Sequence, residues 1–110
     1  MRDGTDGILE RPERSGPRIV GIGGSVRPGN YTNMAMALIQ DEVEKASGFT
    51  FQFIDPASLS LPLPGSGEDS TDADALQSAV GGATGVILGT PEYHGSFSSV
   101  MKLVIENLGF

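Results

Sequence analysis

The stretch RIVGIGGSVRPGNYT at residues 18–32 decides the fold class. Its first six residues, 18–23, predict a strand buried in a parallel sheet, because after Arg18 they are all apolar or glycine on both faces. Glycine, proline, serine and asparagine then dominate residues 24–31, and this composition predicts a loop. Thr32 or Asn33 is the expected cap of a helix that follows at once. The stretch therefore predicts a strand, a glycine-rich loop and a helix in immediate succession.

The same alternation continues along the chain. Helices are expected up to residue 47, over 72–80 and from about residue 96 to 109, with further strands over 49–54 and 85–90. Strands that alternate with helices predict an α/β fold with a parallel sheet and right-handed crossovers. If the first strand is central, the strand order is 2-1-3. A ligand then binds where the loops at 24–32 and 91–96 meet, beyond the carboxyl ends of strands one and three.

The composition is that of one soluble globular domain, with 110 residues of which 38% are hydrophobic and 19% charged. A net charge of -7 disfavours nucleic acid and anionic membranes as partners. The chain has no cysteine, which excludes disulfides, thiolate metal sites and cysteine catalysis and fits a cytoplasmic protein. Residues 1–17 lack the apolar core of a signal peptide. We expect them to be a disordered tail or a cloning remnant, with the domain at 18–110.

The loop from Gly24 to Thr32 carries the groups that hold an anion. Glycines bring backbone N–H groups close to a ligand, and the helix start beyond the loop adds free N–H groups and a positive dipole end. Ser25, Asn30 and Thr32 are neutral donors, and Arg27 is a charged fork for phosphate oxygens. The loop lacks both the Walker lysine and the third glycine of the dinucleotide fingerprint, which favours a mononucleotide phosphate such as FMN. A plain turn with a solvated arginine explains the loop about equally well.

The loop at 91–96 directly follows the third expected strand. Gly95 permits a tight turn, Ser96 suits the cap of the last helix, and backbone groups here suit the pyrimidine edge of a flavin. Tyr93 either flanks the flavin or is a packing residue, the more common role. His94 is the only histidine, and the sequence shows no catalytic partner for it. A glutamate such as Glu92 more often makes local hydrogen bonds or faces solvent than acts as a base.

The two loops together resemble those of the NAD(P)H-dependent FMN reductases, a flavodoxin-like family that includes azo-dye, quinone and chromate reductases. The resemblance rests on Gly-Ser-Val-Arg, on Asn-Tyr-Thr and on Thr-Pro-Glu-Tyr-His-Gly-Ser, and runs from residue 18 to the chain end. Members often have Asn at the position of His94. The resemblance implies that the FMN phosphate is held by Ser25, Arg27, Asn30, Tyr31 and Thr32. It implies that the isoalloxazine is lined by Pro91, Glu92, Tyr93 and Gly95.

The resemblance also implies a doubly wound parallel sheet of five strands, of which these residues supply only the first three. The chain is thus expected to be a fragment of a longer product, or a truncated protein that another chain completes. Its implied function is electron transfer from NAD(P)H through FMN to a small-molecule acceptor: a quinone, azo compound, metal oxyanion or free flavin. A homodimer or homotetramer is implied. The alternatives are a non-enzymatic, flavodoxin-type electron carrier and a flavin-free remnant.

Overall fold

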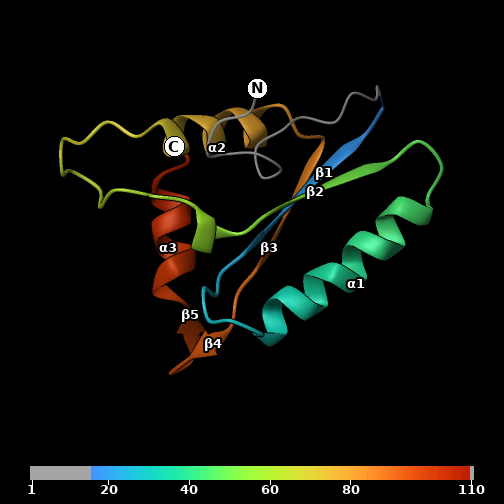
Figure 1. Ribbon diagram of the computed structural model, residues 1–110, viewed down its shortest axis with the longest axis horizontal. Coiled ribbons are helices and arrows are strands. Elements are labelled where there is room, and N and C mark those ends of the chain that lie inside the picture. The colour runs from blue at the N-terminus through green and yellow to red at the C-terminus, as the bar shows by residue number, and fades with distance from the viewer. Residues whose placement is uncertain (1–15, 110) are drawn as a thin grey trace.

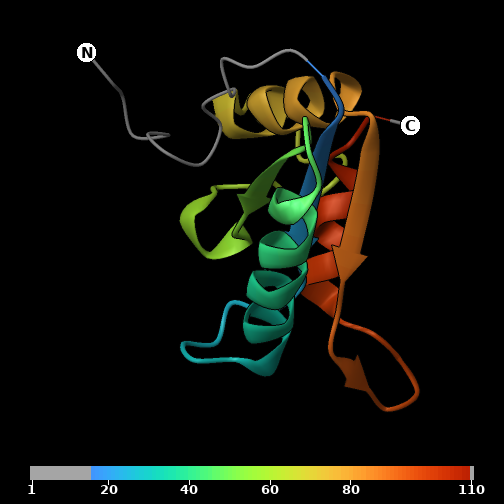
Figure 2. The same cartoon turned by 90° about the vertical axis from the view of Figure 1, so that its right-hand side faces the viewer.

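The computed structural model describes residues 16–109. A parallel three-stranded sheet lies between α1 on one face and α2 and α3 on the other (Figure 1, Figure 2). Residues 1–15 of the expected tail lie outside the described residues. The elements in chain order are β1 Arg18–Gly23, α1 Tyr31–Lys45, β2 Thr50–Ile54, a 3-10 turn Pro56–Ser58, α2 Thr71–Gly81, β3 Gly85–Gly89, β4 Glu92–Tyr93, β5 Ser96–Phe97 and α3 Ser99–Glu106.

The strand order β2-β1-β3 confirms the predicted order 2-1-3. The central strand β1 pairs in parallel with both neighbours, so that Ile22 lies beside Ile54 on one side and Leu88 on the other. Parallel strands end at the same edge of the sheet, so the segments that follow β1 and β3 leave it side by side. None of the helices within residues 16–109 is both long enough and apolar enough to cross a bilayer.

Helix α1 packs against the sheet through Met36, which is almost fully buried. A Cβ atom on Gly21 of β1 would lie 2.5 Å from the Met36 Cε atom, and one on Gly89 of β3 would lie 3.2 Å from its Sδ atom. Both glycines therefore allow the helix to approach the sheet closely. The opposite face of the sheet carries the main core, formed by Val20, Ile22, Ile54, Leu76, Ala79 and Val104.

The cap expected for α1 was wrong by two to three residues. Asn30 has extended backbone angles and its side chain accepts a hydrogen bond from the Asn33 N–H at 2.7 Å, so Asn30 is the cap. Thr32 and Asn33 lie in the first turn, and the helix ends at Lys45. Asparagine caps at least as well as threonine, so residue type alone did not separate the candidates. Helix α2 is capped by Ser70, whose side chain accepts a hydrogen bond from the Ala73 N–H.

Two other details of the sequence interpretation were wrong at residues 91–96. The expected loop is a β-hairpin, in which β4 pairs antiparallel with β5. Its two turn residues, His94 and Gly95, have positive φ angles of 55° and 81°, as the tightest hairpin turns require. Ser96 belongs to β5 and does not cap α3. Ser98 does.

Strand β3 forms an apolar edge of the three-stranded sheet. Val86 and Leu88 are 39% and 43% exposed, although they share a face with the buried Val20 and Ile22. The layer of α2 and α3 therefore stops short of covering β3. An exposed apolar edge strand offers unpaired backbone groups to other chains.

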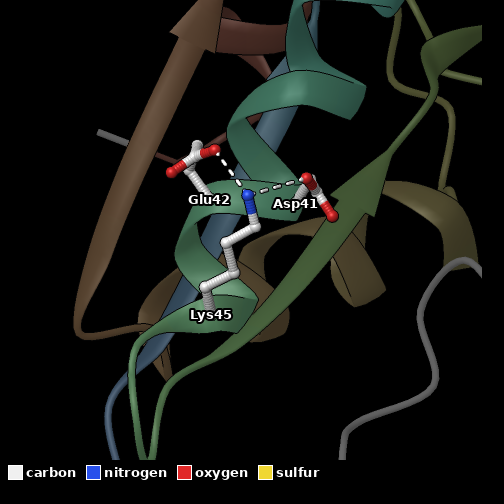
Figure 3. Close-up of polar contacts among 3 residues, drawn as sticks. All are labelled: Asp41, Glu42 and Lys45. Atoms are coloured by element: carbon white, nitrogen blue, oxygen red, sulfur yellow. Dashed lines mark hydrogen bonds and ion pairs between the residues drawn. The ribbon is translucent and has the colours of Figure 1, made fainter.

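Lys45 in the last turn of α1 forms ion pairs with Glu42 at 2.9 Å and Asp41 at 3.4 Å (Figure 3). The hydrogen bond to Glu42 and then the charge of Asp41 raise the pKa of Lys45 above its ordinary value. A raised lysine pKa stabilises the folded protein at every pH below the ordinary lysine pKa. That stabilisation is lost as the pH rises through the raised pKa of the folded state. These side chains are exposed, so solvent and salt screen the contribution strongly.

Candidate functional site

The two segments that leave the ends of β1 and β3 are tied together where they begin. The Gly24 N–H donates to the carbonyl oxygen of Gly89 at 2.7 Å. The Gly24 carbonyl oxygen in turn accepts from the Ser98 hydroxyl at 2.6 Å. A Cβ atom on Gly24 would lie 3.0–3.1 Å from atoms of Ser98, Gly89 and Met101, so this approach favours glycine. The hydrogen bonds hold the first loop, the hairpin and the start of α3 in one place.

Ser98 is the central polar residue of this junction and is 2% exposed. Its hydroxyl also accepts from the Met101 N–H at 3.0 Å and so caps α3. Its own N–H donates to the Thr90 hydroxyl at 2.9 Å. The sequence analysis missed Ser98 and Thr90. The only signal was a run of serines before an apolar helix, in which Ser96, Ser98 and Ser99 all suited a cap.

Asn30 shapes the first loop with both ends of its amide. Its Nδ2 group donates to the Arg27 carbonyl at 2.7 Å while its Oδ1 atom caps α1. The Ser25 hydroxyl, buried at 5% exposure, accepts from the Arg27 N–H at 3.3 Å. Gly29 has a positive φ angle of 67°, which lets the chain turn into the helix. Asn30 therefore holds the loop in shape, while no acceptor for the Ser25 hydroxyl proton occurs among residues 16–109.

The first turn of α1 offers donors to an anion. Tyr31 and Thr32 occupy the first two helical positions, where an N–H has no partner within the helix. No other partner for these two N–H groups occurs among residues 16–109. The positive end of the helix dipole adds to them, and Arg27 is exposed on the loop beside them. Together these groups favour a phosphate.

A hollow of about 260 Å³ lies between the first loop and the hairpin. It is lined by Ser25, Arg27, Gly29, Asn30, Tyr31, Thr32, Pro91 and Tyr93. All the residues expected to bind the cofactor line it, except Glu92 and Gly95. An adjoining hollow of about 220 Å³ shares Ser25, Arg27 and Tyr93 with it and extends to the start of α3. The first hollow alone is smaller than the ~300–1,000 Å³ typical of whole-ligand pockets.

Glu92 and Gly95 interact with each other across the hairpin turn. The Gly95 N–H donates to the Glu92 carboxylate. The local hydrogen bond expected for Glu92 is thus present, and it occupies one of the backbone N–H groups of the segment expected to contact the flavin edge. Tyr93 is 46% exposed and faces both hollows, so its ring is free to contact a ligand.

A separate hollow of about 240 Å³ lies on the connection between β2 and α2. Glu68, Asp69 and Asp72 are among its lining residues. Three carboxylates repel a phosphate, so this hollow does not compete for an anionic cofactor.

Residues 17–110 match the sequence model of the NADPH-dependent FMN reductases. The chain belongs to this family. Among curated proteins, no sequence matches the chain. The crystal structure of the azoreductase AzrA is similar, with a TM-score of 0.56 and 19% sequence identity. The alignment covers 84% of this chain but 55% of that one, so the chain spans about half the length of this azoreductase.

The FMN reductase family and the site agree on the cofactor. The AzrA likeness supports the flavodoxin-like fold, in which the sheet order 2-1-3 places ligands beyond β1 and β3. The donors found there are neutral or cationic and suit the phosphate of FMN. The residues present therefore fit the group that the family description names.

We expect Ser98→Ala to destabilise the protein by about 2–4 kcal/mol. The change removes the cap of α3 and leaves the buried Gly24 carbonyl unpaired. Chemical denaturation measures this loss. Ser78→Ala, an exposed change on α2, is the control and should alter stability by less than about 0.5 kcal/mol. Equal losses of unfolding free energy for the two variants would show that the hydrogen bonds of Ser98 do not stabilise the fold.

We expect His94→Asn to leave stability equal or raise it slightly. Asparagine adopts positive φ more readily than most residues, and Asn-Gly is a preferred pair for this hairpin turn. His94→Val, which places a β-branched side chain at positive φ, should destabilise the hairpin. Thermal unfolding of the three proteins tests this order. A fall in kcat of ~100-fold for His94→Asn with FMN still bound would instead assign acid–base catalysis to His94.

Proposed function

We propose that this chain is the FMN-binding part of a cytoplasmic reductase that passes electrons from NAD(P)H, through FMN, to a small-molecule acceptor. The observation that carries the proposal is the junction at Gly24. It holds a loop with unpaired N–H groups and Arg27 beside a hairpin bearing Tyr93, around one hollow. The family match supports the same chemistry.

In this proposal the first loop holds the FMN phosphate. The N–H groups of Tyr31 and Thr32, the Ser25 hydroxyl and the Arg27 guanidinium donate to its oxygens. Asn30 acts indirectly, by keeping Arg27 and the helix start in place. Because the first hollow is small, we assign it to the phosphate end of the cofactor.

The hairpin flanks the flavin ring in the same proposal. Pro91 and Tyr93 supply the surface that lines the hollow, and the Glu92 to Gly95 hydrogen bond stiffens the turn. Bound FMN supplies hydride acceptance and onward electron transfer. The protein orients the ring and tunes it through nearby groups. Quinones, azo compounds, metal oxyanions and free flavin are the proposed acceptors, and a homodimer or homotetramer is the proposed assembly.

The direct test is NADPH oxidation by the FMN-loaded protein, followed at 340 nm in the presence of a quinone or an azo dye. We expect acceptor-dependent turnover, because reduced FMN is reoxidised by such compounds. A protein that binds FMN without oxidising NADPH would be an electron carrier. A protein that binds no FMN would contradict the proposal altogether.

Arg27→Ala separates phosphate binding from ring binding. We expect it to weaken FMN binding by about 1.5–3 kcal/mol, since a charge-assisted hydrogen bond is lost. Riboflavin lacks the phosphate and should be affected much less. Lys102→Ala, which removes an exposed charge on α3, is the control for net charge. Titration of both flavins against the three proteins measures the difference, and equal losses for FMN and riboflavin would place Arg27 away from the phosphate.

A further inference from the structure

Asp55 directly follows β2 and links the end of that strand to the first turn of α1. Its Oδ2 atom accepts a hydrogen bond from the Asn33 Nδ2 group at 3.4 Å, and its Oδ1 atom accepts from the Ala57 N–H at 3.0 Å. The second bond fixes the carboxylate at the start of the 3-10 turn that follows β2. The first bond therefore ties α1 to an anchored acceptor on a different element.

The link continues from Asn33 into the first loop. The Asn33 N–H donates to the Asn30 Oδ1 atom at 2.7 Å, and the Asn30 Nδ2 group donates to the Arg27 carbonyl oxygen at 2.7 Å. A chain of three hydrogen bonds thus runs from Asp55 to the backbone of Arg27. It passes through the helical turn whose first two N–H groups are free for an anion.

The Asn33 side chain faces the sheet, and half of its amide is unsatisfied there. Its Oδ1 atom is buried and has no hydrogen-bond partner among residues 16–109. A Cβ atom on Gly23, the last residue of β1, would lie 2.7 Å from this oxygen. A buried acceptor without a partner costs stability, and an apolar side chain would avoid that cost. Fold stability alone therefore does not account for an asparagine here, whereas its Nδ2 bond to Asp55 does.

Neither Asp55 nor Asn33 is among the residues that line the two hollows beside the first loop. We propose that Asp55 is a positioning residue for FMN, which acts through Asn33 to hold the first turn of α1 and the Arg27 backbone where the phosphate binds. The inference rests on the proposed function, which assigns the phosphate to that turn. Binding sites need supporting hydrogen bonds that keep their donors within about 0.5 Å of the productive geometry. The Asp55 carboxylate supplies such support from outside the site.

Titration of FMN and riboflavin separates this positioning role from a general effect on the fold. Asp55→Ala should weaken FMN binding about three- to tenfold, the scale of one hydrogen bond. Riboflavin lacks the phosphate and should be affected much less. Ser58→Ala is the matched control, because it removes the bond from the Ser58 hydroxyl to the Asp55 carbonyl in the same 3-10 turn and keeps the carboxylate. Equal losses for the two flavins in Asp55→Ala, or an equal loss of FMN binding in Ser58→Ala, would overturn the proposal.

A double-mutant cycle tests whether Asp55 acts through Asn33. Asn33→Ala should weaken FMN binding about as much as Asp55→Ala does, because either change breaks the same hydrogen bond. The double variant should then bind FMN no more weakly than the weaker of the two single variants. Additive losses would mean that the two residues act independently, and the proposal would be wrong.

Amide hydrogen exchange in the flavin-free protein tests the same hydrogen-bond chain without the cofactor. The Asn33 N–H should exchange at least about threefold faster in Asp55→Ala than in the unchanged protein, because the turn is then less firmly held. Ser58→Ala should leave that rate unchanged. An equal rate in Asp55→Ala and the unchanged protein would contradict the proposal. If the unchanged protein bound neither flavin, the proposed function would fail, and the exchange rates would still decide whether Asp55 holds the turn.

Discussion

The hydrogen bond from the Gly24 N–H to the Gly89 carbonyl is the contact on which the site depends. It continues the pairing of β1 with β3 one residue past the end of β1, and its acceptor is the last residue of β3. The Ser98 hydroxyl then ties the same peptide to the start of α3. Because a side chain on Gly24 would crowd three neighbours, the arrangement needs glycine there. A loop that supplies donors and a hairpin that supplies a ring surface are thereby held at a fixed separation.

Helix α1 combines two roles on two parts of its surface. Its first turn leaves N–H groups free for an anion, and its inner face rests on Gly21 and Gly89 through Met36. The inner contact sets where the first turn lies, since the helix cannot shift without moving Met36 from the sheet. Anion binding and core packing are therefore coupled through one rigid element.

Much of this architecture was predictable because its signals are local. Strands of parallel sheets are apolar on both faces, and the sequence shows this at residues 19–23 and 85–89 before any partner strand is known. The loop from Gly24 to Thr32 is likewise recognisable as a candidate anion site, because glycine, serine and arginine stand next to the start of a helix. The predictions failed where several residues that can cap a helix lie within a few positions of one another. The choice of Asn30 over Thr32, and of Ser98 over Ser96, depends on the backbone angles that the surrounding chain imposes.

By itself, the sequence predicted the α/β order of elements, the strand order 2-1-3 and the resemblance to the family, and it determined the residue types of the first loop. Only the tertiary structure decided which donors are free and which are already engaged. The Gly95 N–H is taken by Glu92, the Asn30 amide by Arg27 and Asn33, and the Ser98 hydroxyl by Gly24. Hydrogen bonding depends on distances of a few tenths of an ångström between residues up to 74 positions apart. Residue type and spacing carry no such distances, so the division of the site into binding and positioning groups emerges only in three dimensions.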